Sequence, residues 1–155
     1  MTETPNYYNR SIDLCIYQGI EPGKRVTVDQ SLFNQGGSVC TGIQKLIQRW
    51  VLRFLTPIGS VKFHPEWGTS FLENAISFNS EIDAQLAFYS ANADACSQLR
   101  AEETDDMDLE ERIDEVTLNY ITITETGFSL GVTLTTLFGT TTPVVLPILI
   151  NPLPL

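Results

Sequence analysis

The spacing of apolar residues changes from a helical to a strand period within residues 41–137, and this change limits the folds that the chain can adopt. Between residues 41 and 55, apolar side chains recur every three or four positions, which is the period of an amphipathic helix. After residue 115 they recur at every second position, which is the period of a strand with one buried face. Helices followed by a strand region predict an α+β fold and argue against a repeated βαβ winding.

The first helix has the most regular pattern. Its apolar stripe consists of Ile43, Leu46, Ile47, Trp50, Val51, Phe54 and Leu55. Pro57 and Gly59 end it, because proline lacks a backbone donor and disfavours helical geometry in the residue before it. A short strand is expected at 61–63.

Two more helices are expected before the strands. Thr69 is a candidate N-cap of a short helix that carries Phe71, Leu72, Ala75 and Ile76. Ser80, with Asp83 three residues later, resembles a capping box and predicts a longer helix to about Arg100. We expect its buried stripe to consist of Ile82, Leu86, Tyr89, Ala93, Cys96 and Leu99.

The strand region predicts one antiparallel hairpin. Its alternating apolar residues are Val116, Leu118 and Tyr120 in one run and Phe128, Leu130, Val132 and Leu134 in the next. The link 124–127 is short and contains glycine, as hairpin turns do. We therefore expect a small single α+β domain, with about three helices packed on a mainly antiparallel sheet that ends in a C-terminal hairpin.

Extended arms flank this core, which we place at 41–137. Residues 1–40 form an N-terminal arm with short strands expected at 12–16 and 25–29. Residues 138–155 form an apolar tail whose four prolines, at positions 143, 147, 152 and 154, exclude a helix. Such a tail either lies over its own core or adds to the exposed sheet edge of a neighbour, and the sequence leaves both open.

Charge and cysteine content argue against several classes of function. The 155 residues carry a net charge of −10, which disfavours binding to nucleic acid or to anionic membranes. The three cysteines are widely spaced and include no CxxC, so neither a disulfide framework nor a zinc site is indicated. No apolar run is long enough for a membrane helix and the N-terminus does not resemble a signal peptide, so we expect no membrane partner.

Two clusters of charge stand out. Residues 102–115 hold nine of the nineteen acidic residues, with Arg112 as the only base among them. The first helix has Lys45, Arg49 and Arg53 at every fourth position. We expect the acidic run to be a solvated loop and the basic residues to coat an exposed helix face, the alternative for each being contact with a partner of opposite charge.

Three short motifs accompany the first helix: Leu55-Thr-Pro-Ile-Gly59 at its end, Pro65-Glu-Trp-Gly68 in the following turn, and Glu110-Glu-Arg-Ile113 before the hairpin. Together they resemble the wedge, or sheath-initiator, family of contractile-tail baseplates, which contractile bacteriophages share with type VI secretion machines. Glu111 stands where that family usually has proline, and Ser60-Val61 stands where an acidic residue and arginine are common. Glu110 and Arg112 keep the two charges of the third motif.

The resemblance implies a structural protein without catalytic residues, cofactor or metal. It would join the baseplate wedge to the first sheath ring and template sheath assembly by strand addition, in six copies, within a virion baseplate assembled in the bacterial cytoplasm. Its partners would be the tail sheath protein and other wedge proteins, with tube or hub proteins as further candidates. The implied structural and interface residues are Pro65, Trp67, Gly68, Glu110 and Arg112. The expected sheath contacts are Thr133, Thr135, Val144, Val145 and Leu146.

Two other classes of function remain as alternatives. A cell-wall glycoside hydrolase of lysozyme type needs two carboxylates, one with a raised pKa, and Glu66 with Glu73 is the best pair available. A generic assembly adaptor would share only the α+β layout. Trp67 is either an interface anchor or, as we expect, a core residue beside the turn, and His64 is expected to be a turn residue.

Overall fold

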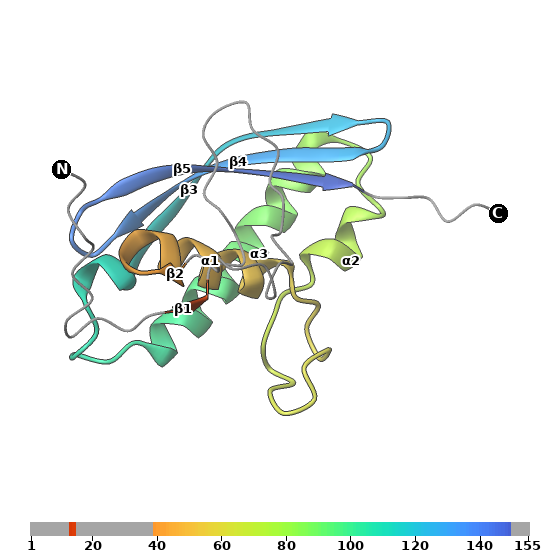
Figure 1. Ribbon diagram of the computed structural model, residues 1–155. Helices are drawn as coiled ribbons and strands as arrows, with labels where there is room; N and C mark the ends of the chain where they lie inside the picture. Colours follow the sequence, from red (N-terminus) through yellow and green to blue (C-terminus); the bar gives the residue numbers. More distant parts are fainter. Residues whose placement is uncertain (1–12, 15–38, 150–155) are drawn as a thin grey trace, which may run out of the picture.

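Three antiparallel strands and three α-helices make up most of the computed structural model, which describes residues 13–14 and 39–149 (Figure 1). The helices are α1 (Gly42–Leu55), α2 (Phe71–Ala75) and α3 (Glu81–Glu102), followed by the 3-10 helix η1 (Leu109–Glu111). The strands are β3 (Ile113–Thr124), β4 (Gly127–Thr136) and β5 (Thr141–Leu149), and β1 (Asp13–Leu14) pairs with β2 (Val39–Cys40). The predicted α+β class is confirmed.

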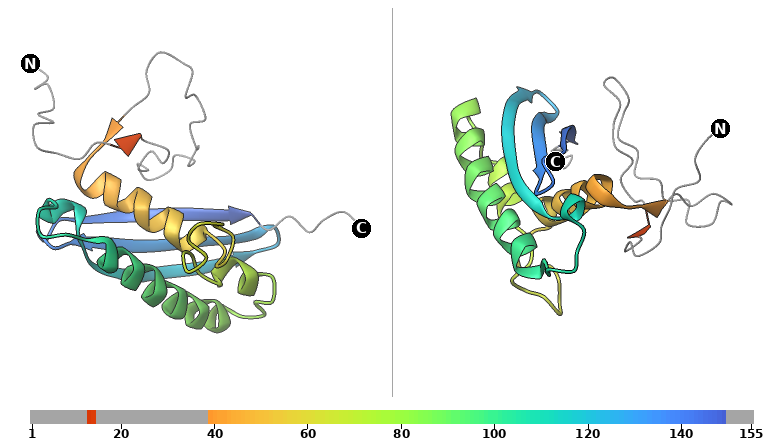
Figure 2. Two further views of the ribbon diagram at one scale, coloured as in Figure 1. Left: turned by 90° about the horizontal axis from the view of Figure 1, so that it is seen from below. Right: turned by 90° about the vertical axis from the view of Figure 1, so that its left-hand side faces the viewer.

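The helices lie on one face of the three-stranded sheet (Figure 2). Aromatic rings fill the space between the layers: Phe54 of α1 contacts Phe71 and Phe88, with ring centroids 4.5 and 5.6 Å apart. Phe71 also meets Phe128 of β4 edge-on, at 5.5 Å. These rings are at most 4% exposed, so the core joins both helical and strand segments of the chain.

The stripe predicted for α1 is largely confirmed. Leu46, Ile47, Trp50, Val51 and Phe54 are buried, and Ile43 and Leu55 pack partly against the core. Trp50 also stacks on Phe54 at 4.9 Å, and its indole N–H donates to Asn92 of α3 at 3.0 Å. The helix ends before Pro57, as expected.

The cap of α3 is confirmed, but most of its predicted stripe is wrong. The Ser80 hydroxyl accepts from the Asp83 N–H at 3.2 Å. Cys96 and Leu99 are buried, whereas Ala93 and the three larger residues of the stripe point to solvent. The buried face consists of Ala84, Phe88, Ala91, Ala95, Cys96 and Leu99. Its alanines let the helix lie close to its neighbours, which long side chains would prevent.

Two local predictions before α3 are also corrected. Residues 61–63 form turns instead of a strand, because a hydrogen bond from the Gly59 N–H to the Pro65 carbonyl at 3.0 Å closes this loop on itself. Ser70, not Thr69, is the N-cap residue of α2, although the Thr69 hydroxyl accepts from the Phe71 N–H at 3.3 Å. Ile76 is exposed.

The predicted hairpin is present, with two irregularities in its register, the first between Ile113 and Glu115. β3 and β4 pair from Ile113–Thr136 to Thr124–Gly127, and the second register shift lies between Leu118 and Tyr120. The shift makes Ile121 a core residue in place of Tyr120. Tyr120 instead covers Gly131 on the outer face, where an added Cβ would lie 2.2 Å from its ring.

The C-terminal segment completes the sheet of its own domain. Thr141–Leu149 pair antiparallel with β4 and bury Val144 and Leu146, so the core extends beyond the expected boundary at residue 137. Pro143 and Pro147 are compatible with this because β5 is an edge strand. The expected strand at 12–16 is represented by β1, while the expectation for 25–29 and the prolines at 152 and 154 lie outside the described residues.

Candidate functional site

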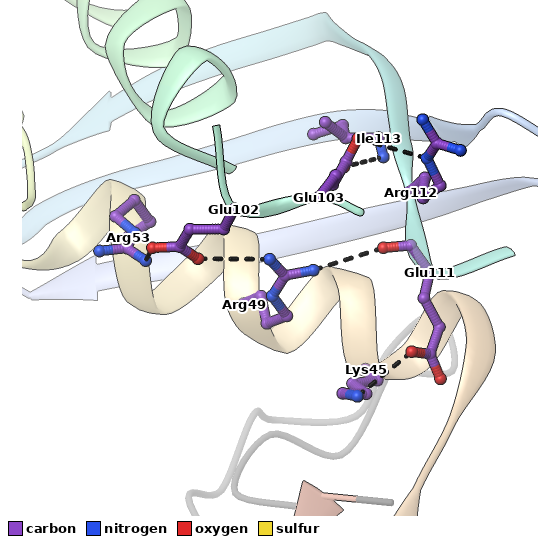
Figure 3. A network of polar contacts seen from close by, with 8 residues as sticks. All are labelled: Lys45, Arg49, Arg53, Glu102, Glu103, Glu111, Arg112 and Ile113. Carbon is purple, nitrogen blue, oxygen red and sulfur yellow. Dashed lines mark hydrogen bonds and ion pairs between the residues drawn. The ribbon is translucent and has the colours of Figure 1, made fainter. Parts of the chain in front are cut away.

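The third motif is anchored through Glu111, which is 2% exposed at the end of η1. Its carboxylate accepts from the Gly42 N–H at 3.3 Å. It also accepts from the Lys45 ammonium at 3.2 Å (Figure 3). The Arg49 guanidinium donates to the backbone carbonyl of Glu111 at 3.4 Å. A carboxylate at a helix N-terminus is stabilised by the orphan N–H groups and by the helix dipole, so Glu111 fixes the start of α1 against the chain that enters the hairpin.

The remaining charges of α1 bind the acidic run as well. Arg49 and Arg53 both pair with Glu102, at 3.3 Å for Arg49 (Figure 3). Glu103 lies 3.8 Å from Arg112 and accepts from the Ile113 N–H at 2.6 Å. The expectation of an exposed basic helix face is therefore wrong: Lys45 and Arg53 are each only 8% exposed. The acidic run is likewise partly internal, at Glu103 and Glu111, whereas Glu102 is exposed and still pairs with both arginines.

The structure distributes the motif charges differently from the sequence prediction. Glu110 is half-buried, its N–H donates to the Asp108 carboxylate, and Arg112 pairs with Glu103. The buried carboxylate comes from Glu111, the position at which the resembling family usually has proline. Sequence reasoning missed this residue, although one signal was available: three basic residues at helical spacing require acidic partners if any of that face is buried.

The second motif lies in a closed turn after α1. The Ile58 N–H donates to the Thr69 carbonyl at 3.1 Å, and the Thr69 N–H donates to the Thr56 carbonyl at 2.8 Å. Gly68 has φ +100, and an added Cβ would lie 2.3 Å from the Thr56 carbonyl oxygen. The Gln98 amide of α3 accepts from the Gly68 N–H at 3.0 Å and donates to the Gly68 carbonyl at 2.9 Å. Glycine is thus required where the turn meets α3.

Trp67 is half-buried beside this turn and is not part of the core cluster. Its ring stacks on His64 at 4.0 Å, and the Arg53 guanidinium lies 3.7 Å from the ring centroid. A hollow of about 290 Å³ opens next to it, lined by Arg49, Leu52, Arg53, Thr56, Val61 and Trp67. Pro65 is exposed at the tip of the turn. Trp67 therefore supports the position of Arg53 from the surface side.

The carboxylates of the hydrolase alternative lack the environment of a general acid. Glu66 is exposed, and backbone hydrogen bonding together with the His64 side chain at 3.2 Å lowers its pKa. A glycosidase acid needs the opposite shift, which comes from apolar surroundings. Glu73 is exposed on α2.

The expected sheath contacts fall on two strands of different kinds. Thr133 and Thr135 belong to the central strand β4, so their backbone is already paired on both sides and cannot accept another strand. Val144 and Leu146 face the core, and Val145 is half-buried on the other face of β5. Strand addition to this sheet would have to use the outer edge of β3 or of β5.

Prolines determine which backbone groups of the sheet face outward. Proline cannot donate to a strand ladder, so Pro143 and Pro147 must have their backbone groups turned away from β4. The alternate pairs, Leu130–Leu146 and Phe128–Ile148, then exchange the hydrogen bonds between β4 and β5. On the other side of β4, Leu130 pairs with Ile121 of β3 and Phe128 pairs with Ile123. The backbone groups of Ile121 and Ile123 therefore face the open edge of β3.

The two sheet edges are not equally available to a partner. The outer edge of β5 lacks donors at its two prolines. In the first half of β3, the Asp114 carbonyl accepts from Arg100 at 2.6 Å and the Val116 carbonyl accepts from Asn92 at 3.3 Å, both from α3. Within the described chain, no residue outside the sheet hydrogen-bonds the backbone of residues 118–124. These residues form the more open edge.

Comparison with protein-family models, with curated proteins and with solved structures found no match to this chain. Among the described residues, no group of three or more His, Cys, Asp or Glu side chains is arranged to hold a metal ion. No helix in the described ranges has the length and apolar character needed to cross a membrane.

Proposed function

We propose that this protein is a structural component of a contractile-tail baseplate, which joins the wedge to the first sheath ring and templates sheath assembly by strand addition. The observation that carries the proposal is the open edge of β3 at residues 118–124, which can take an incoming strand. The contact of Glu111 with the start of α1 also makes the third motif and the first helix, about 70 residues apart in sequence, one unit, although it uses the position at which the resembling family usually has proline. The turn motif joins the same unit through Gly68 and Gln98.

The proposal assigns different roles to the two sides of the molecule. The helix and turn side holds the motif residues, including Pro65, Trp67, Gly68, Glu110 and Arg112, and would face the other wedge proteins. The sheet side would face the sheath, with residues 118–124 of β3 as the edge that an incoming strand extends. An edge of this kind gives affinity through backbone hydrogen bonds and register through alternating side chains.

The proposal is tested by omission. A sheath subunit from the same source is mixed with baseplates assembled with and without this protein, and ordered sheath is counted by electron microscopy. We expect sheath to grow only from baseplates that contain this chain. Equal growth from both preparations would refute the sheath-initiator function. A generic adaptor could also be required for sheath growth without touching the sheath. Crosslinking of residues 118–124 to the sheath subunit distinguishes the two functions, because only a sheath initiator contacts the sheath through this edge.

A further inference from the structure

Helix α3 carries large apolar side chains on two opposite sides, and only one of them packs on the domain. Phe88 and Leu99 are fully buried, whereas Ile82, Leu86 and Tyr89 are 68, 66 and 57% exposed. The exposed three are spaced by four and then three residues, which places them along one line of the helix surface. We call these three residues the α3 ridge.

The α3 ridge has the character of an interaction surface. No element in the described part of the chain covers it, and Ala93, one turn further along the same line, is exposed as well. Single exposed apolar residues are common, but a contiguous row of large ones on a soluble protein marks a site of association. A row of this kind on the side of α3 that faces away from the core is suited to packing against a second element.

The shape of this surface fits another helix. α3 has 22 residues and is about 33 Å long at 1.5 Å per residue. Small exposed residues, Ser90, Ala93 and Ser97, lie beside or along the ridge and allow a second helix to approach to the usual 8–10 Å between axes. A shallow hollow of about 440 Å³ adjoins Leu86, bordered by Asn74, Phe78 and Asp83 among others. A side chain of the second helix can enter it.

The charge of α3 indicates which kind of helix can pack on the ridge. From Glu81 to Leu99, α3 carries three acidic residues and no basic one, and all three acids, Glu81, Asp83 and Asp94, are exposed. A second copy of this chain would bring acid against acid, within a protein of net charge −10. A helix whose apolar stripe is flanked by Lys or Arg is complementary instead. It would gain both apolar burial and favourable charge contacts.

We propose that the α3 ridge docks an amphipathic helix of another protein, whose apolar stripe is flanked by basic residues. The inference stands apart from the proposed baseplate function, because none of the motif residues takes part in it. The proposal specifies the partner by the chemistry of the partner's docking surface, which has apolar residues at helical spacing with Lys or Arg beside them.

The test is site-specific photocrosslinking of the full chain in the cells that naturally make it. Tyr89→p-benzoylphenylalanine places the crosslinker on the ridge with little change of shape. Phe63→p-benzoylphenylalanine is the matched control, because Phe63 is also an exposed aromatic residue, in the turn after α1. We expect the Tyr89 variant, and not the control, to crosslink a helix-periodic segment with flanking Lys or Arg, as identified by mass spectrometry.

A second substitution separates docking from chance proximity. Leu86→Ser in the Tyr89-labelled chain is expected to reduce the product about tenfold, because a leucine side chain is lost from the apolar contact. Since Leu86 is exposed, the circular dichroism of the chain should not change. Absence of the product overturns the proposal, as does crosslinking to a second copy, to this chain itself or to an acidic segment. A yield unaffected by Leu86→Ser overturns it too.

Discussion

Replacement of Glu111 by alanine should destabilise the fold strongly, and far more than replacement of the neighbouring Glu110. The side chains of Glu111 and Lys45 are 3 and 10% exposed, so the ion pair is largely desolvated. Removing one partner of such a pair costs about 3–5 kcal/mol. The carboxylate also accepts from Gly42, and a hydrogen bond to a charged group contributes about 1.5–3 kcal/mol within that total. Against a typical stability of about 5–15 kcal/mol, such a loss is easily measured.

The assay is urea unfolding followed by circular dichroism and tryptophan fluorescence, with the m-value checked for constancy. Glu111→Gln keeps the acceptor for Gly42 and loses only the charge, so its free energy of unfolding should fall between wild type and Glu111→Ala. Glu110→Ala is the matched control and should change the free energy by no more than about 0.5 kcal/mol. If Glu111→Ala cost under about 1 kcal/mol, or Glu110→Ala as much as Glu111→Ala, the anchoring role of Glu111 would be refuted.

Three further predictions use the same unfolding assay. Gly68→Ala should cost about 3 kcal/mol or more, because alanine is strained at this left-handed φ and its Cβ would clash with the Thr56 carbonyl. Gly59→Ala, at φ +80 with open space around it, should cost only about 1 kcal/mol. Equal costs for the two variants would contradict the steric argument. Gln98→Ala should cost about 1–3 kcal/mol through its two lost hydrogen bonds and should lower the hydrogen-exchange protection of the Gly68 amide, whereas unchanged protection would argue against this link. Burial raises the pKa of Cys96 from its usual 9.0 to about 11, so above pH 9 the unfolded chain ionises this thiol first. Stability should therefore fall between pH 9 and 11 more steeply in wild type than in Cys96→Ala, and parallel pH profiles would contradict the raised pKa.

Elements with strong local signals were predictable from the sequence. The stripe of α1, the Ser80 cap and the hairpin link all depend on residues close together in the chain. The buried face of α3 was not predictable from side-chain size. Alanines face the core because the helix packs closely, and larger apolar residues at other positions made a plausible but incorrect stripe.

The site residues depend on contacts between distant segments, which a single sequence does not reveal. Lys45 and Glu111 are 66 residues apart, and either could have been a solvated charge. The third sheet strand was equally ambiguous, since an extended apolar segment with Pro143 and Pro147 suits its own sheet edge and a neighbour's alike. The register shift at Tyr120 is equally non-local, because the Tyr120 ring occupies the space that a side chain at Gly131 of the opposite strand would need. Local chemistry constrained the elements, and long-range packing decided their partners.

The most direct test is whether the open edge of β3 nucleates sheath. Ile123→Pro removes one outward N–H without removing a ladder bond, while Ile123→Thr changes the same side chain and keeps that N–H. Both variants should fold as wild type by circular dichroism. If the proposed function holds, baseplates assembled with each variant and mixed with a sheath subunit should show sheath by electron microscopy on the threonine variant and almost none on the proline variant. Equal sheath growth on both would contradict strand addition at this edge.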